Sequence, residues 1–221
     1  MRGVFVTGTG TEVGKTVVAA VIARELATGG ERVAVFKPAV SGLDEAGSGG
    51  ADHELLRRAS GSEQADDEIA PYRYGPAVSP HLAADLAGEA IDPPRLVAAA
   101  RAAAEAADVL VAEGVGGIMV PLTLGYLVRD FARELGLPVV VAASPELGTI
   151  NHTLMTLEAA RAVGLEVRAV VLTPWPERAE EMQESNREAI ARLGDVEALT
   201  LGELDAGDPE AWPQLGLGSS L

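Results

Sequence analysis

The two lysines of this chain are the residues whose positions point first to chemistry. Lys15 and Lys37 are the only lysines among 221 residues, and the rest of the 17 basic residues are arginines. Each lysine follows a short apolar run, Val4-Phe5-Val6 or Val33–Phe36, of the kind that forms a buried strand. Two compact ammonium groups at neighbouring strand ends indicate a site for anions, with a phosphoryl group as the leading candidate.

Lys15 belongs to a glycine-rich run that is typical of a phosphate-binding loop. In such a loop, backbone N–H groups and the start of the following helix converge on phosphates, the lysine reaches the β- and γ-phosphates, and the next hydroxyl ligates Mg²⁺. The usual pattern is G-x(4)-G-K-[ST]. Here Thr9 takes the first glycine position, and Gly8 makes the spacing one residue longer. The full run is Gly8-Thr9-Gly10-Thr11-Glu12-Val13-Gly14-Lys15-Thr16.

A magnesium–nucleotide site also needs carboxylates, because Mg²⁺ prefers oxygen ligands. Glu113 closes the apolar run that starts at Val109, so a strand would deliver its carboxylate to the loop edge of a sheet. Asp52 follows a glycine-rich loop, residues 41–50, and starts an expected helix. The alternatives are an ordinary strand-end acid for Glu113 and a helix N-cap for Asp52.

Lys37 cannot be a second phosphate-loop lysine. Leaving a strand beside the first one, it is placed to neutralise charge on a transferring γ-phosphoryl group or on an anionic acceptor. Ser41 lies four residues further along the same loop, where the alternative is a turn serine before Gly42.

The rest of the chain alternates short β-branched runs with longer amphipathic ones. This pattern predicts one α/β domain over residues 1–221, with a doubly wound, mostly parallel β-sheet flanked by helices, of the P-loop NTPase type. The expected strands are 3–7, 32–36, 108–113, 138–143, 167–173 and 196–201. The expected helices are 15–28, 52–59, 80–86, 93–107, 126–135, 150–163 and 177–193.

Composition narrows the functional classes. A net charge of −16 at pH 7 argues against nucleic acid and anionic membranes as partners. The absence of cysteine excludes thiol catalysis and cysteine metal sites. The apolar stretches are far shorter than a membrane span, and the first one breaks at once into the glycine loop, so we expect a cytoplasmic protein.

Several motifs together resemble the dethiobiotin synthetase family of the biotin pathway. They occur in the family's order and spacing from residue 3 to about residue 165, and the elongated phosphate loop is characteristic of that family. The matching segments are 8–16, Lys37-Pro38-Ala39-Val40-Ser41-Gly42, Ser79-Pro80-His81, Glu113-Gly114-Val115-Gly116-Gly117 with Pro121-Leu122, and Leu147-Gly148-Thr149-Ile150-Asn151-His152.

The resemblance implies an ATP-dependent cyclo-ligase. Its substrates would be 7,8-diaminononanoate, CO2 or bicarbonate, and ATP. They would react through a carbamate and a carbamic-phosphoric anhydride to give dethiobiotin, ADP and phosphate. The family's catalytic residues match Lys37 and Lys15, its Mg²⁺ ligands match Thr16, Asp52 and Glu113, and its substrate contacts match Thr11, Lys37 and Ser41.

The family also places substrate and nucleotide contacts at more distant segments. A homodimer is implied, in which Thr149, Ile150 and Asn151 bind the substrate carboxylate across the interface. The remaining implied nucleotide contacts are Glu12, Val13, Gly14, Lys15, Thr16, Val17, Gly114, Val115, Gly116, Thr173, Pro174, Glu203, Leu204 and Asp205.

One segment departs from the family pattern. Many members carry an adenine-reading Asn near the position of Thr173, where this chain reads Leu172-Thr173-Pro174-Trp175. The base preference therefore stays open at this stage, and Trp175 either stacks on a base or packs against the next helix.

Other activities would share the same phosphate site. A related P-loop amidoligase or small-molecule kinase is one alternative. A dimeric ATPase switch is another, but such switches usually carry an extra lysine early in the loop, where this chain has Gly10.

Overall fold

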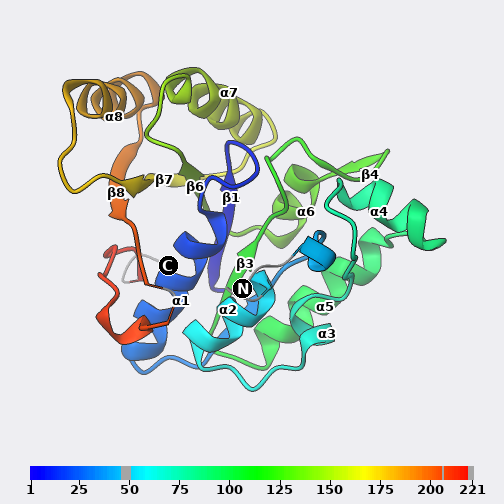
Figure 1. Ribbon diagram of the computed structural model, residues 1–221. Coiled ribbons are helices and arrows are strands. Elements are labelled where there is room, and N and C mark those ends of the chain that lie inside the picture. The colour runs from blue at the N-terminus through cyan, green and yellow to red at the C-terminus, as the bar shows by residue number, and fades with distance from the viewer. Residues whose placement is uncertain (46–50, 206, 219–221) are drawn as a thin grey trace.

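The structure is a computed structural model that describes residues 1–45, 51–205 and 207–218. Within these residues, six strands form one sheet in the order β2-β3-β1-β6-β7-β8, and every neighbouring pair is parallel (Figure 1). The predicted α/β fold with a doubly wound parallel sheet is therefore confirmed. The strands are β1 (Gly3–Gly8), β2 (Val33–Phe36), β3 (Val109–Glu113), β6 (Val139–Ala143), β7 (Val167–Trp175) and β8 (Glu197–Gly202).

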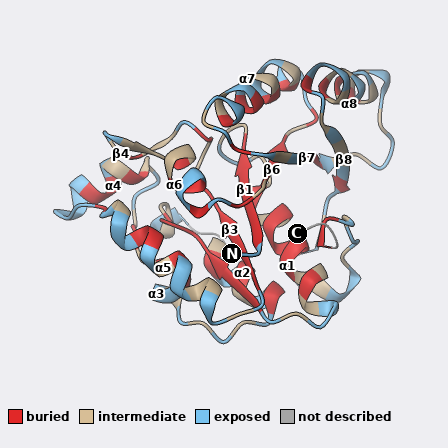
Figure 2. Ribbon diagram, turned by 180° about the vertical axis from the view of Figure 1, so that it is seen from behind, coloured by how far each residue is buried: buried red, intermediate tan, exposed pale blue. Residues whose placement is uncertain are grey.

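Helices cover both faces of this sheet, and the alternation of side chains along each strand explains why. In β1, Phe5 faces one hydrophobic cluster, whereas Val4 and Val6 face another. The first cluster receives the buried sides of the helices from α4 to α8, and the second receives α1 and α2 (Figure 2). The helices are α1 (Lys15–Thr28), α2 (Asp52–Ser60), α3 (Asp66–Ile69), α4 (Pro80–Ala87), α5 (Pro93–Glu105), α6 (Val128–Leu135), α7 (Thr149–Arg161) and α8 (Glu181–Gly194).

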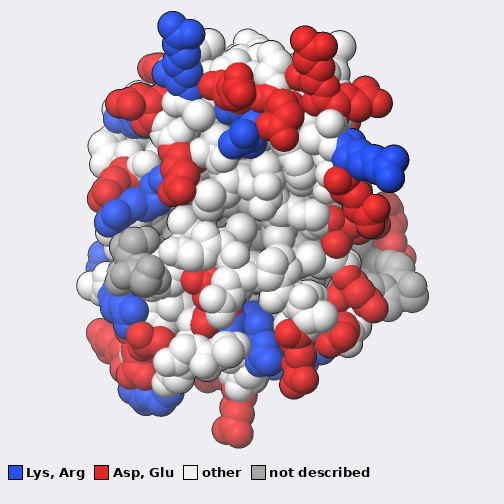
Figure 3. Space-filling view, turned by 90° about the vertical axis from the view of Figure 1, so that its left-hand side faces the viewer, with Lys and Arg blue, Asp and Glu red and all other residues white. Residues whose placement is uncertain are grey.

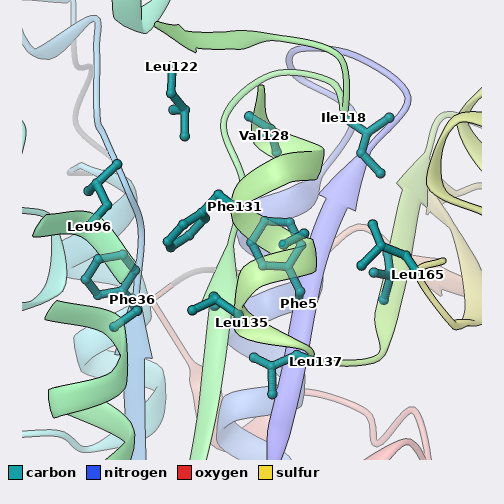
Figure 4. Packing of buried hydrophobic residues seen from close by; sticks show 14 of the residues in the cluster. Phe5, Phe36, Leu96, Ile118, Leu122, Val128, Phe131, Leu135, Leu137 and Leu165 are labelled. Atoms are coloured by element: carbon teal, nitrogen blue, oxygen red, sulfur yellow. The ribbon is translucent and has the colours of Figure 1, made fainter. Parts of the chain in front are cut away.

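Aromatic side chains fill the centre of the first cluster. Phe131 of α6 lies edge-on to Phe5, with ring centroids 6.0 Å apart, and 5.9 Å from Phe36 of β2 (Figure 4). All three are fully buried. This packing holds β1 and β2 under α6, and the carboxyl ends of both strands lead into the phosphate loop and to Lys37.

Two local expectations were wrong, and one short helix had no counterpart among them. The stretch 114–125 contains strand β4 (Pro121–Thr123), which pairs antiparallel with β5 (Tyr126–Leu127), so α6 begins at Val128 and not at residue 126. The short helix α3 was not expected. Helix α8 begins at Glu181, one turn later than expected. The glycine-rich loop 41–50 lies partly outside the described residues, which resume at residue 51.

No helix in the described part of the chain is both long and apolar enough to cross a membrane.

Candidate functional site

The phosphate loop connects β1 to α1 and depends on glycine at two positions. Gly14 has φ +83°, and a Cβ atom there would lie 2.4 Å from Cγ2 of Thr173. A Cβ at Gly8 would lie 2.7 Å from Cγ2 of Val13. Neither position has room for a side chain, so these glycines let the backbone fold back tightly before the helix starts.

Two side chains at the start of α1 fix the loop. The ammonium of Lys15 donates to the carbonyl of Gly10 at 2.7 Å. The hydroxyl of Thr16 donates to Oε1 of Glu113 at 2.9 Å. Because Glu113 ends β3, this second bond ties the phosphate loop to the carboxyl end of the neighbouring strand.

Lys37 lies just beyond β2 and joins the same group. Its ammonium is 2.6 Å from Oε1 of Glu113 and 2.6 Å from Oδ2 of Asp52, the first residue of α2. The side chains of Lys37 and Glu113 are 4% and 0% exposed, whereas that of Asp52 is 46% exposed. A buried cation is thus held between two carboxylates that come from different elements.

The charges of this group are strongly coupled. Burial acts to lower the pKa of Lys37, but attraction to Glu113 and Asp52 outweighs it and raises that pKa. Burial raises the pKa of Glu113, and the Lys37 ammonium opposes the shift. For Asp52, burial is outweighed by the Lys37 ammonium, and the pKa is lowered. Burial lowers the pKa of Lys15. Lys37 is therefore a firmly protonated cation near neutral pH.

The oxygen atoms around Lys37 are also suitable ligands for a hard cation. Oε2 of Glu113 is buried and makes no hydrogen bond. Within the described ranges, no group of three or more His, Asp or Glu side chains could hold a metal by itself. The protein offers two carboxylates, of Glu113 and Asp52, and the Thr16 hydroxyl. Such a set fits Mg²⁺, which is usually held by one or two carboxylates together with water and substrate phosphates.

These groups line one cavity of about 790 Å³. Its predicted members are Thr11, Glu12, Gly14, Lys15, Thr16, Val17, Lys37, Ser41, Asp52, Glu113, Val115 and Gly116. Sequence reasoning did not assign its uncharged wall to the site, although Ala39 and Ser79-Pro80 belong to motifs that it singled out. The wall residues are Ala39, Leu55, Ala77, Val78, Ser79, Pro80 and Val120.

Two expected nucleotide contacts serve the packing of the loop in this structure. The N–H of Gly114 donates to the carbonyl of Val6, and a Cβ on Gly114 would lie 2.9 Å from Val128. Val13 packs over Gly8 and is absent from the residues that line the cavity within the described chain.

Two further groups of expected contacts lie outside this cavity. Thr173 and Pro174 lie near the end of β7, where Thr173 is beside Gly14 of the phosphate loop, and residues 203–205 follow β8. Thr149 starts α7, where its hydroxyl is 3.4 Å from that of Thr153 and its N–H donates to the carbonyl of Glu146. Ile150 and Asn151 follow it in the first turn of this helix.

The strand, glycine loop and helix at the carboxyl end of a parallel sheet define a P-loop NTPase. Solved structures agree. The septum site-determining protein MinD from Pyrococcus horikoshii, complexed with Mg-ADP, matches 92% of this chain and 82% of its own with a TM-score of 0.56. The cell division ATPase MinD from Pyrococcus furiosus gives a TM-score of 0.54. Both are 16% identical to this chain, so they show a shared fold alone.

Sequence comparison narrows the class. A family model described as an AAA domain matches residues 2–209. The ATP-dependent dethiobiotin synthetase BioD of Bacillus cereus is 39% identical over 208 residues, which cover 94% of this chain and 86% of that protein. The protein of the same name from Anaeromyxobacter dehalogenans is 42% identical over 91% of this chain and 89% of its own. The chain belongs to the ATP-dependent dethiobiotin synthetase family.

Proposed function

We propose that this chain closes the ureido ring of dethiobiotin from 7,8-diaminononanoate and CO2, with ATP as the phosphoryl donor. The observation that carries the proposal is the Lys37 ammonium, buried against Glu113 in the same cavity as the phosphate-loop lysine. Family membership supports the overall reaction, and the roles below are assigned from this geometry. We further propose that residues 1–221 act as one domain.

The first intermediate is a carbamate. One amine of the substrate attacks CO2, forms an N–C bond and loses a proton, which leaves an anion. Lys37 lies where it stabilises that anion beside the γ-phosphate. Thr11 and Ser41 line the same cavity and are placed to contact the substrate. The uncharged wall formed by Ala39, Val78 and Val120 suits the alkyl chain.

Phosphoryl transfer follows. A carbamate oxygen attacks the γ-phosphorus, and the bond to the bridging oxygen of ADP breaks. Lys15 and the backbone of residues 12–17 hold the phosphates, and Lys37 neutralises charge as it develops, which is the main requirement of such a reaction. The second amine then attacks the carbamoyl carbon, phosphate leaves with the carbamate oxygen, and loss of a proton closes the ring.

Mg²⁺ is the proposed cofactor. Thr16, Asp52 and Glu113 would hold it, and Oε2 of Glu113 is buried with no other hydrogen-bond partner. Bound there, Mg²⁺ would neutralise negative charge on the nucleotide phosphates.

The nucleoside end points away from Lys37. Because the γ-phosphate has to face Lys37 on the β2–β3 side, the rest of the nucleotide extends past Gly14 toward the ends of β7 and β8. We place it against Thr173, Pro174 and the loop Glu203-Leu204-Asp205. Contacts of Thr173 with Gly14, and of Trp175 with Gly202, bring these segments together at this side of the phosphate loop.

A homodimer would complete the substrate site. Leu147 and Met155, before and within α7, are 87% and 62% exposed, which suits a surface that a second copy covers. Thr149, Ile150 and Asn151 at the start of α7 would bind the substrate carboxylate, with the N–H groups of Ile150 and Asn151 as donors, because the N–H of Thr149 donates to the carbonyl of Glu146. We expect this enzyme to work in the cytoplasm.

The test is phosphate release in the presence of 7,8-diaminononanoate, bicarbonate and Mg²⁺, compared across ATP, GTP and CTP. Release that requires the diamine supports the ligase. Hydrolysis that is indifferent to the diamine would rule it out and favour an ATPase of another kind. The same series measures the base preference that the departure at Thr173 leaves open.

A further inference from the structure

The chain beyond β8 returns along α1, the helix that follows the phosphate loop. This C-terminal segment, residues 203–205 and 207–218, lies beside the lower part of α1 in Figure 1. Leu217 is only 5% exposed and joins the hydrophobic cluster under α1, with Trp212 and Leu215 packed against it. On the face that carries β8 and this segment, charged side chains surround an uncharged middle (Figure 3).

One carboxylate holds the far end of the segment. Oε2 of Glu25, on α1, accepts hydrogen bonds from the N–H groups of Leu215 at 2.8 Å and Gly216 at 3.1 Å. Its Oε1 accepts a third from Gly218 at 3.1 Å. A carboxylate can accept at both oxygens, and bonds to an ionised acceptor are stronger than neutral ones. Glu25 therefore holds three backbone N–H groups of the C-terminal segment, which lie about 190 residues away in the sequence.

A second hydrogen bond connects the anchored end of the C-terminal segment to its start. The indole N–H of Trp212 donates to the carbonyl of Asp205 at 2.8 Å. Because Trp212 precedes the anchored residues by only a few positions, fixing Leu215 also fixes the ring. The loop 203–205 is thus connected through Trp212 to Glu25. The exposed ion pair of Arg24 with Glu210, at 4.0 Å, adds little.

We infer that Glu25 is a positioning residue for the nucleoside end of the nucleotide. It makes no contact with the phosphates, since it lies ten residues beyond Lys15 on α1. Instead it holds the loop 203–205 in place before the nucleoside binds. The entropy cost of ordering the loop therefore does not reduce the binding free energy of the nucleotide. This inference rests on the nucleoside placement proposed above.

The two ends of the nucleotide should respond differently to the loss of the Glu25 carboxylate. In Glu25→Gln, only one oxygen remains as an acceptor and an amide N–H₂ faces backbone donors, so the anchor is lost. We expect the affinity for ATP to fall about five- to tenfold, the scale of one or two net hydrogen bonds. Inorganic tripolyphosphate contacts only the phosphate loop, so its affinity should stay unchanged.

The experiment measures the dissociation constants of ATP and tripolyphosphate by calorimetry for the wild type and three variants. Trp212→Phe keeps the aromatic packing but removes the bond to Asp205, and should reproduce the selective loss. Glu210→Gln removes the same charge from the exposed side of the segment, and should bind both ligands as the wild type does.

Unchanged ATP affinity in Glu25→Gln, or equal weakening of ATP and tripolyphosphate, would overturn the inference. Equal weakening would mean that Glu25 supports the fold of α1 as a whole. Diamine-dependent phosphate release by the wild type is measured separately. If that release fails while the binding difference holds, the proposed ligase function is wrong and the positioning role stands.

Discussion

Replacing Lys37 with methionine should destabilise the protein when no nucleotide or Mg²⁺ is present. Methionine keeps most of the side-chain volume and removes only the charge. The substitution leaves Glu113, whose side chain is 0% exposed, without its cation, whereas Asp52, at 46% exposure, regains water. The cost therefore comes mainly from a single buried carboxylate.

The size of the destabilisation follows from the loss of one buried ion pair. Breaking a buried ion pair by removing one partner costs about 3–5 kcal/mol. Because Asp52 is half exposed, we expect the lower end, about 3 kcal/mol. For a chain of this size each kcal/mol lowers Tm by about 2–4 °C, so Tm should fall by about 6–12 °C.

The loss should also depend on pH. Burial raises the pKa of Glu113, and without the Lys37 ammonium nothing opposes that shift as strongly. A carboxyl whose folded pKa lies above its unfolded pKa destabilises the fold at higher pH. This deficit shrinks as the pH falls below the folded pKa, and it is gone below the unfolded pKa. The gap between Lys37→Met and the wild type should therefore narrow on acidification.

Urea unfolding of Lys37→Met, and of the double variant Lys37→Met with Glu113→Gln, measures the effect. The neutral amide should restore much of the lost stability, because the buried carboxylate charge of Glu113 is gone. Turnover should be abolished in both variants. Equal stability of Lys37→Met and the wild type, or a double variant less stable than the single one, would refute the reasoning.

Three further substitutions test other parts of the structure. Gly14→Ala places a Cβ at φ +83°, 2.4 Å from Thr173, so it should weaken ATP binding at least tenfold by calorimetry and lower Tm. Gln64 donates to and accepts from the backbone of Val35 on the edge strand β2, so Gln64→Leu should cost about 1–3 kcal/mol in urea unfolding, with wild-type KM values. Thr16→Val removes a proposed Mg²⁺ ligand and should raise the Mg²⁺ concentration needed for half-maximal turnover, whereas Thr16→Ser should not.

Much of the sheet and part of the site could be predicted because each rests on local pattern. The β-branched runs of β1, β2, β3 and β6 are fully buried strands, and helix α1 spans residues 15–28 as predicted. Parallel strands that end at one edge bring Lys37 and Glu113 together, although they are separated by 76 residues. That convergence follows from strand order and needs no knowledge of the side chains between them.

Other features depend on packing between distant segments. The β4–β5 hairpin is short and pairs through only Pro121 and Thr123, too little to give a periodic signal. The wall formed by Ala77 and Val78 belongs to an irregular stretch that tertiary contacts alone place beside the phosphate loop. The same holds for Glu25, whose partners lie about 190 residues away. A glutamate in the last turn of a helix carries no sign of such a contact in its own neighbourhood.

The most direct test of the proposed reaction follows one oxygen atom. Single-turnover reactions with ATP, Mg²⁺, 7,8-diaminononanoate and bicarbonate bearing a heavy oxygen isotope should yield labelled phosphate, because the carbamate oxygen that attacks the γ-phosphorus leaves with it. Mass spectrometry of the released phosphate reads the transfer before the label exchanges with water. Dethiobiotin formed alongside unlabelled phosphate would contradict attack by the carbamate, and with it the role assigned to Lys37.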